Sequence, residues 1–365
     1  MKKHLFLLSS LFTISTGFLS AQQSNRQPQQ SNRQPQQQQP ESVTTQPKGM
    51  ITPAVAPRVR NGADVIITAD FIWWKTNISG MEYATSGVAD GGHFVPLGSS
   101  TKRGHVHQPN FDFQPGFKVG AGLDFAYDGW DLYADYTWLN GETKRNSISA
   151  HDGNGARNLV PLSSNNGGIG QIDIAKESSR WRQHFNVVDL ELGRNFFISR
   201  FLTLRPHFGL KSAWIHEKLK IESKSADATL KAFQKRKQTL WGIGTRAGLD
   251  TVWHFARNWG VYGDIAFTAL WSDFHFKAKD HVDNMTTGVD ATNFHTREVI
   301  TEVIPVFETG IGLTYMTWFN QDSCQFVISA GWEEQIWLGF NHLVDFDRTG
   351  NLSVQGLTLK VGFVF

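Results

Sequence analysis

From residue 64 to the last residue, apolar and polar side chains alternate with a period of two over most of the chain. In residues 130–138 the even positions are apolar or aromatic, whereas Asp131 and Asp135 occupy the reverse face. A period of two is the pattern of a β-strand whose two faces meet different surroundings. The pattern covers ten segments: 64–75, 116–127, 130–138, 188–193, 202–211, 241–253, 259–271, 303–315, 326–332 and 357–365. The chain is therefore predicted to be all-β.

Short and long connections between these segments alternate strictly. The short turns are Asp128-Gly129, Ser199-Arg200, 256–258 and 320–323, and the long connections are 76–112, 141–180, 218–238, 276–298 and 341–350. Asp-Gly between two alternating runs is a strong hairpin signal. Outer-membrane barrels have short periplasmic turns and long external loops. We expect an antiparallel transmembrane β-barrel of ten strands, and the two longest connections leave twelve or fourteen open.

Tryptophan spacing favours a membrane barrel over a soluble sandwich, which would also alternate. Trp241 and Trp253 lie twelve residues apart on one face, and Trp259 and Trp271 repeat that spacing on the next segment. At ~3.3 Å per residue and ~45° of tilt, this spacing spans ~28 Å, close to the ~25 Å apolar band of such barrels. The predicted aromatic girdle comprises Trp130, Trp138, Trp241, Trp253, Trp259 and Trp271.

The reverse faces carry charges in the middle of the strands, where they need water or partners. These candidate lumen residues are Asp131, Asp135, Asp189, Glu191, Arg205, Lys211, Arg246, Asp250, Asp264 and Glu308. With Asp124, Glu333, Lys118 and Lys360 added, nine acidic residues face five basic ones. Rings of charge bias ion selectivity, which predicts a weak preference for cations. Pairing of these charges across a packed interior is an equally weighted alternative.

Other features of the sequence limit the remaining classes of function. A net charge of +2 indicates no nucleic-acid partner, and the single cysteine, Cys324, allows no intramolecular disulfide. His105, His107 and His151 lack a compact third ligand, so neither a metal nor another cofactor is expected. We find no spacing that suggests catalytic residues, so an enzyme is not expected. The basic run at 231–237 is interpreted as a solvated external loop, with contact to anionic lipid as the alternative.

The two ends of the sequence carry predicted sorting signals. Lys2, Lys3 and the short apolar stretch at 5–19 predict a secretory signal peptide over residues 1–21. Residues 22–60 are rich in Gln and Pro and are expected to form a disordered periplasmic tail. The barrel is then expected over 61–365. Phe363 and Phe365 end the closing strand and resemble the signal read by the barrel-assembly machinery.

Several ordered segments carry a resemblance to a known family. They are ADFIWWKTNISGMEYA from residue 69, QPGFKVGAGLDFAYDGWDLYADYTW from 114, VVDLELGRNFFISRFLTLRPHFGLKSAW from 187, WGIGTRAGLDTVW from 241, GDIAFTALW from 263 and NLSVQGLTLKVGFVF from 351. The chain resembles the major-outer-membrane-protein-like porins of chlamydia-related bacteria, which are similar to the Legionella major outer membrane protein.

The resemblance implies pore formation in the outer membrane of a Gram-negative cell. Outer-membrane lipids, the assembly machinery and small solutes or ions are the expected partners, and assembly of identical chains is left open. The alternative is a structural or adhesive barrel whose external loops contact a host.

Overall fold

The computed structural model describes residues 62–86, 105–126, 128–149, 159–161, 174–225, 229–288, 290–320, 324–345 and 348–365. The predicted signal peptide and Gln-rich tail lie outside these ranges, as does His151. Within the described part, no helix is long and apolar enough to cross a bilayer.

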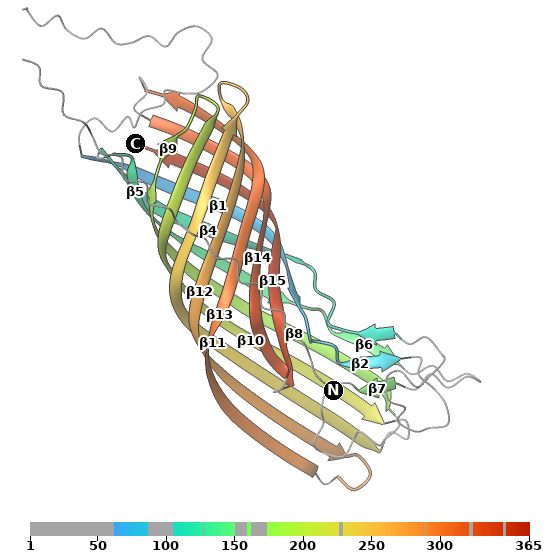
Figure 1. Cartoon of the computed structure of the whole chain (residues 1–365). Coiled ribbons are helices and arrows are strands. Elements are labelled where there is room, and N and C mark those ends of the chain that lie inside the picture. The colour runs from blue at the N-terminus through green and yellow to red at the C-terminus, as the bar shows by residue number, and fades with distance from the viewer. Residues whose placement is uncertain are drawn as a thin grey trace, which may run out of the picture. The chain divides into compact units, whose positions relative to one another are not determined.

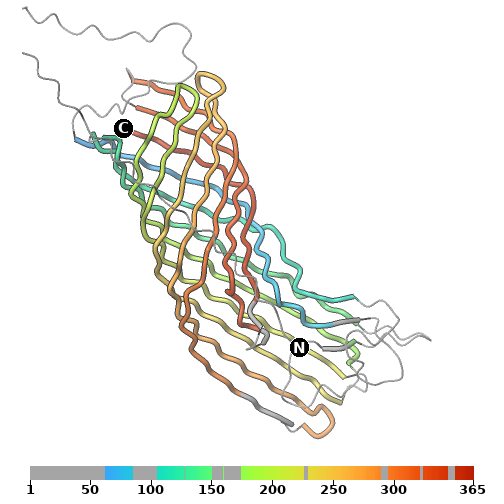
Figure 2. The backbone as a smooth tube through the Cα atoms, in the orientation of Figure 1, coloured from blue at the N-terminus to red at the C-terminus, as the bar shows by residue number. Residues whose placement is uncertain are grey.

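Ten long antiparallel strands form a closed ring (Figures 1 and 2). In ring order they are β1 (Ala63–Ile78), β4 (Phe113–Phe125), β5 (Trp130–Glu142), β8 (Ile174–Arg194), β10 (Leu202–Ser225), β11 (Leu230–His254), β12 (Trp259–Asn284), β13 (Asp290–Phe319), β14 (Cys324–Asp345) and β15 (Arg348–Val364). The ring closes where β1 pairs with β15, from Ile66 opposite Val364 to Ile78 opposite Leu352. Closure leaves no unpaired edge in the part of the ring where all ten strands pair, as a membrane barrel requires, whereas residues 290–305 of β13 pair with β12 alone.

Five short strands do not join the ring. They are β2 (Ala84–Ser86), β3 (His105–His107), β6 (Asn146–Ser149), β7 (Leu159–Pro161) and β9 (Phe196–Phe197). The first four belong to the two longest predicted connections and pair with one another or with β8. The prediction of a ten-stranded barrel is therefore confirmed, and within the described residues no additional hairpin joins the ring.

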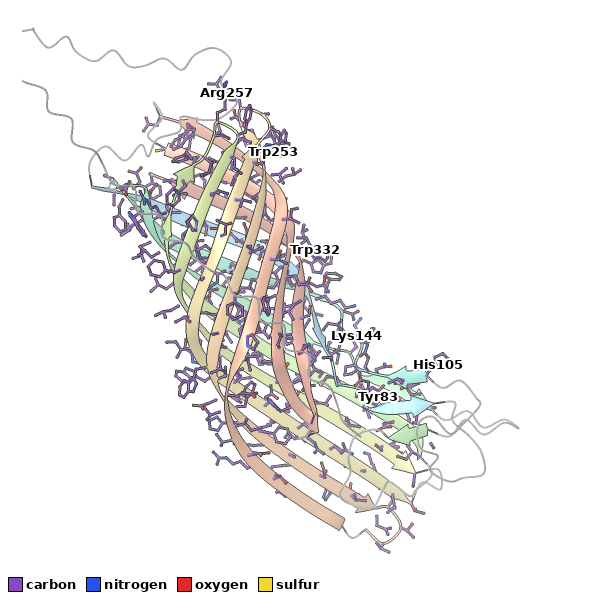
Figure 3. The ribbon with its side chains drawn as sticks, viewed as in Figure 1. Tyr83, His105, Lys144, Trp253, Arg257 and Trp332 are labelled. Carbon is purple, nitrogen blue, oxygen red and sulfur yellow. The ribbon has the colours of Figure 1, made fainter. Side chains whose placement is uncertain are left out.

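The short turns gather at one end of the barrel, here called the turn end. Asp128 and Gly129 both have positive φ, 56° and 70°, which matches the twist of a tight two-residue hairpin. The last residue lies at the same end, because Val65 and Phe365 exchange two backbone hydrogen bonds of 2.7 and 3.0 Å. Figure 3 shows Trp253 and Arg257 toward this end and His105 toward the opposite one, here called the far end.

The prediction of long loops at 218–238 and 276–298 is wrong. β10, β11, β12 and β13 continue through them as strands, and the β14–β15 hairpin covers most of 341–350. The basic run at 231–237 likewise lies on β11 rather than in a solvated loop. In Figure 1 the long strands run well past the β14–β15 hairpin. They are long because alternation persists in these stretches, but with the two faces exchanged.

The exchange is clearest on β10. Before Trp214 the outward side chains are apolar, such as Phe208 and Leu210, and Lys211 is buried inside. After Trp214 the outward positions hold charges such as Lys218, whereas apolar side chains such as Ile215 and Leu219 are buried. Lipid therefore borders the first half of the strand and water the second.

The predicted girdle tryptophans all lie on the outward face. Trp253, Trp259 and Trp130 lie toward the turn end, and Trp241, Trp271 and Trp138 lie at the other edge of the apolar band. Between these edges, Ile311, Val303 and Ile265 are 65%, 60% and 59% exposed. A continuous band of bare apolar side chains of this kind is suited to lipid and not to water.

Candidate functional site in the barrel lumen

All ten predicted lumen residues point into the barrel interior. All except Asp189 and Lys211 line a cavity of about 490 Å³ on the turn-end side. The cavity extends from Asp64 and Val364 at the turn end to Gln335 and Thr358, midway along the barrel. It therefore lies at the depth of the apolar band.

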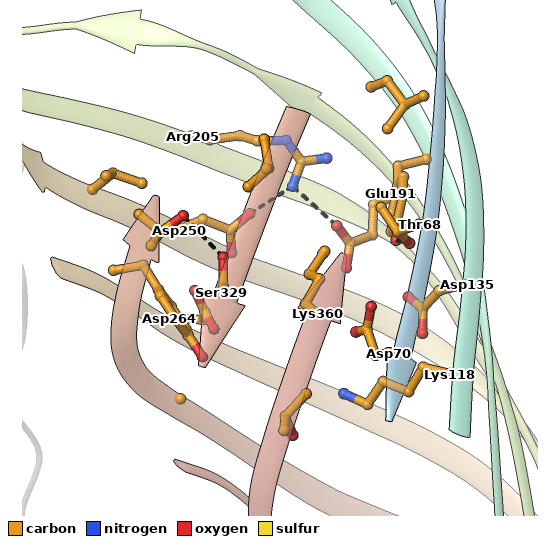
Figure 4. Close-up of a pocket in the computed structure, with 18 of the residues that line it drawn as sticks. Thr68, Asp70, Lys118, Asp135, Glu191, Arg205, Asp250, Asp264, Ser329 and Lys360 are labelled. Atoms are coloured by element: carbon orange, nitrogen blue, oxygen red, sulfur yellow. Dashed lines mark hydrogen bonds and ion pairs between the residues drawn. The ribbon is translucent and has the colours of Figure 1, made fainter. Parts of the chain in front are cut away.

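Arg205 on β10 holds three carboxylates from three other strands, and Figure 4 shows two of them, Glu191 and Asp250. Its guanidinium donates to Asp131 at 2.6 to 3.1 Å, to Asp250 at 2.6 Å and to Glu191 at 3.1 Å. The neighbouring strand makes room for it at Gly193, where a Cβ would lie 2.5 Å from Arg205 Nε. Charge-assisted, partly bidentate bonds of this kind fix the geometry of the buried group.

A second ionic cluster lies deeper in the lumen. Lys211 is fully buried, with Nζ 2.7 Å from Asp189 and 2.9 Å from Glu308. Arg246 donates to Glu308 at 2.9 Å and also contacts Glu191, which links this cluster to the one around Arg205. The charges therefore pair across strands, as the alternative interpretation of the sequence expected.

Pairing leaves acidic side chains in excess. Asp135 and Asp264 line the cavity, and neither has a salt bridge within the described residues. Lys118 pairs with Glu333 and lies 4.8 Å above the Trp74 ring. Lys360 lies 5.5 Å from the centre of the Tyr133 ring. The cavity thus keeps a negative lining although its cations are bound.

Four further interior residues, Asp70, Tyr133, His207 and Tyr262, were not among the predicted lumen sites. Each occupies an inward position within a segment already predicted as a strand, so counting every polar side chain on the reverse faces finds all four. Asp70, for example, follows Thr68 on the inward face of β1.

Glu191, His207 and Asp250 each bring one possible ligand atom within 4.8 Å of the others. The His207 nitrogens lie 3.6 Å from Glu191 and 3.4 Å from Asp250. Arg205 already bonds to both carboxylates. The guanidinium thus supplies the positive charge that a metal ion would bring, and the geometry favours a structural ion cluster.

Aromatic side chains close the lumen beyond the cavity. Phe185 on β8 packs edge-on against Trp337 on β14 with centroids 5.6 Å apart, followed by Phe340 at 6.4 Å and Phe274 on β12 at 6.1 Å. All four side chains are completely buried. We call them the aromatic barrier. It crosses the barrel near the level of Trp241 and Trp271, because Phe274 is three residues beyond Trp271.

The far end of β14 brings the barrier into place. After Gly339, with φ of 74°, the strand turns inward and reaches β11, which is not its neighbour in the ring. Gln238 on β11 donates to the Phe340 carbonyl at 2.7 Å and accepts from the His342 amide at 2.9 Å. The predicted external loop at 341–350 therefore begins as an inward fold across the lumen.

The sequence carried a signal for this closure. Both faces are apolar in FIWW at 71–74, where Ile72 and Trp74 are fully buried. A short run that is apolar on both faces indicates a strand segment with neither face in contact with water. The period-two pattern assigned only the outward face of this segment and left Ile72 and Trp74 without a role.

Two carboxyl groups lie inside the far end of the barrel, beyond Trp214. Gln183 donates to Glu217 at 3.1 Å, and Ser223 donates to Glu177 at 3.2 Å. Burial raises the pKa of each carboxyl from its ordinary value of 4.5 to about 8. Both groups are therefore mainly protonated at neutral pH, as suits the apolar packing around them.

The family model described as "Legionella pneumophila major outer membrane protein precursor" matches residues 55–365. The chain belongs to this major outer membrane protein family. The match covers the whole described barrel and confirms the resemblance seen in the sequence. It also assigns this family member to the outer membrane. No curated protein matches the chain.

Solved outer-membrane barrels are only distantly similar to this family member. The outer membrane protease OmpT from Escherichia coli is 9% identical, with a TM-score of 0.36 over 83% of this chain and 96% of that one. The Pseudomonas putida toluene transporter TodX is 11% identical, with a TM-score of 0.30 over 85% and 90%. A major outer membrane protein from Thermus thermophilus is 10% identical, with a TM-score of 0.27 over 84% and 100%. Likenesses this remote carry no argument about function.

We predict that Arg205→Gln destabilises the barrel by about 3–5 kcal/mol, because Asp131, Glu191 and Asp250 lose their shared cation. Urea unfolding in detergent micelles measures the change. Arg194→Gln, which removes an outward arginine, is the control and should stay within about 1 kcal/mol of the wild type. An Arg205→Gln protein as stable as this control would show that the cluster is not held by its guanidinium.

We predict that the barrel loses stability as pH rises from about 5 to about 8. With a pKa of about 8 in the folded protein and 4.5 as the ordinary value, the folded state binds more protons over this interval, and its free energy of unfolding falls. Glu217→Gln removes one such group, so its Tm should exceed that of the wild type at pH 9 by roughly 3 °C. Thermal unfolding at pH 5, 7 and 9 tests this, with the exposed Glu298→Gln as control. Parallel pH profiles for the wild type and Glu217→Gln would contradict it.

Proposed function

We propose that this member of the family is a narrow outer-membrane pore for small hydrophilic solutes and ions. One observation carries the proposal: a closed ring of ten strands surrounds a cavity of about 490 Å³ that is lined by charged side chains and lies at the depth of the apolar band. A barrel with a purely structural role needs no cavity at this depth. Small eight-stranded barrels, for example, fill their interior with side chains.

The lining supports a preference for cations. Asp135 and Asp264 add negative charge that the neighbouring lysines and arginines do not bind directly. Rings of carboxylates favour cation passage. The ionic clusters around Arg205 and Lys211 then keep the wall rigid and leave the excess charge in place.

The aromatic barrier acts as the gate in this proposal. Hydrophobic constrictions block ions because water leaves them. Trp337 and Phe340 both come from the end of β14, and Gly339 lies between them with a positive φ. Movement of the segment after Gly339 would therefore withdraw Phe340 from the barrier while the ring stays paired, because Trp337 remains opposite Val306 and Leu352.

The main alternative, a structural or adhesive barrel, is favoured by the same barrier. A fully packed far end blocks the diffusion of solutes through the lumen, and its rigidity would support external loops that contact a host. An enzyme finds less support, because the Arg205 cluster holds its carboxylates in ion pairs. Export through the signal peptide, recognition of Phe363 and Phe365 by the assembly machinery, and assembly of identical chains belong to the proposal as well. Phe363 is exposed on the outward face of β15, where such recognition would need it.

We predict that Trp337→Ala/Phe340→Ala raises single-channel conductance in planar bilayers severalfold, because two barrier rings are removed. The wild type should show small, infrequent steps. Trp332→Ala/Phe326→Ala is the matched control, since these side chains lie on the lipid-facing side of the same strand. If the wild type and the barrier variant both stay silent after folding is verified, the pore proposal fails and the structural barrel is preferred.

We predict that Asp135→Asn/Asp264→Asn, placed in the barrier variant, shifts the reversal potential toward zero under a salt gradient. The two substitutions remove unpaired lumen charge without breaking an ion pair of the described barrel. Asp273→Asn/Asp283→Asn makes the same change in charge on the outward face and should leave the potential unaltered. A reversal potential that is equal in all three proteins would remove both carboxylates from the selectivity argument.

A further inference from the structure

Basic side chains form two rows across five neighbouring strands, on the outward face beyond Trp214, Trp241 and Trp271. The first row is Arg182, Lys218, Lys237, Lys277 and Arg297, and the second is Arg180, Lys220, Lys235, Lys279 and His295. We call the two rows the cation belt. Within each row, every residue lies directly opposite the next in the strand register.

Such rows are unfavourable by themselves, because like charges directly opposite each other on adjacent strands destabilise a sheet. Glu142 pairs with Arg180 and Arg182 at one end of the belt. The six lysines and Arg297 have no carboxylate partner within the described residues. Partial burial, followed by the charges of Lys220, Lys235, Lys237 and Arg182, lowers the pKa of Lys218, and a similar combination lowers that of Lys235.

The belt lies just above the lipid-facing band. Lys237 and Lys235 are four and six residues beyond Trp241 on β11. At ~3.3 Å per residue and ~45° of tilt, the two rows stand about 9 and 14 Å above the girdle. The headgroup layer of a bilayer extends roughly 5–8 Å beyond the hydrocarbon core on each side. Lysine side chains are long enough to reach down into this layer.

The belt is also continuous with the lipid-facing surface. The same outward face of β11 passes from Ile243 and Trp241 through Thr239 to Lys237. A lipid whose acyl chains lie against the apolar band would therefore place its headgroup directly against the belt. A soluble partner would have no reason to bind at this height in preference to the more distant surface of the long strands.

We propose that the cation belt binds the phosphate groups of anionic lipid headgroups in the outer leaflet. Two parallel rows offer several ammonium and guanidinium groups to each phosphate, which suits a phosphorylated glycolipid with more than one phosphate. Bound phosphates neutralise the repulsion along each row, so the lipid stabilises the far halves of β10, β11 and β12. This surface is separate from the lumen and does not depend on whether the barrel conducts.

The test is binding of lipid A carrying two phosphates to the full-length protein in neutral detergent, compared with the same lipid after removal of its phosphates. We expect the wild type to prefer the phosphorylated lipid by at least about tenfold, and Lys218→Gln/Lys237→Gln/Lys277→Gln to lose that preference. Arg194→Gln/Arg200→Gln/Arg257→Gln, which removes equal charge near the turn end, should keep it. In lipid-free detergent the lysine variant should be at least as heat-stable as the wild type.

Two results would overturn the proposal. One is equal binding of the phosphorylated and dephosphorylated lipids by the wild type. The other is tighter binding of a soluble sulfated polysaccharide than of the phosphorylated lipid, which would make the belt a surface for external glycans. If the lysine variant does not fold, a salt titration of the wild type decides: binding through the belt must weaken steeply with ionic strength, and binding that is insensitive to salt refutes it.

Discussion

The boundary between lipid and water along the outward face of the barrel determines how the rest of the structure is arranged. On the lipid side, outward positions must be apolar, so polar side chains can only go inside. On the water side the requirement is reversed, and apolar side chains become free to fill the interior. Trp214, Trp241 and Trp271 mark the change on three adjacent strands. One set of continuous strands thus contains two differently packed segments, a lipid-bound barrel with a polar centre and a far end with an apolar centre.

This arrangement explains why the cavity and the barrier lie one above the other. Charges within the apolar band have no outside water to reach, so they pair across the lumen, as Arg205 does with Asp131 and Asp250. Above the band, Phe185, Trp337, Phe340 and Phe274 pack as the core of a soluble β protein would. The protonated Glu217 is compatible with that packing because it carries no charge that would need solvation. Closure of the lumen is thus a consequence of strands that continue beyond the membrane.

Local alternation in the sequence was sufficient to predict the ten ring strands, their outward faces and the inward position of every proposed lumen charge. The prediction failed beyond the tryptophan girdle, where the apolar side chains of the alternating pattern point inward instead of outward. Residues 218–238 were predicted to be a loop because their apolar side chains occupy the opposite face from that expected for lipid contact. The inward fold after Gly339 could not be predicted, because it depends on a contact with Gln238 more than a hundred residues away. Pairing within the ionic clusters likewise depends on which strands face each other across the lumen, and a single sequence does not state this.

The positive charge of the cation belt, on the outward face beyond the girdle, needs a separate explanation. Strands that leave the membrane need polar outward side chains, but a mixture of acids and bases would keep them hydrated and would add favourable cross-strand pairs. Elsewhere on the outward face such pairs occur, for example Arg145 with Glu222 at 2.5 Å. In the cation belt, Lys218, Lys237 and Lys277 instead stand side by side with no carboxylate between them. Solubility alone does not select that arrangement, whereas a layer of phosphates at the same height does, because it supplies the negative charge from outside the chain.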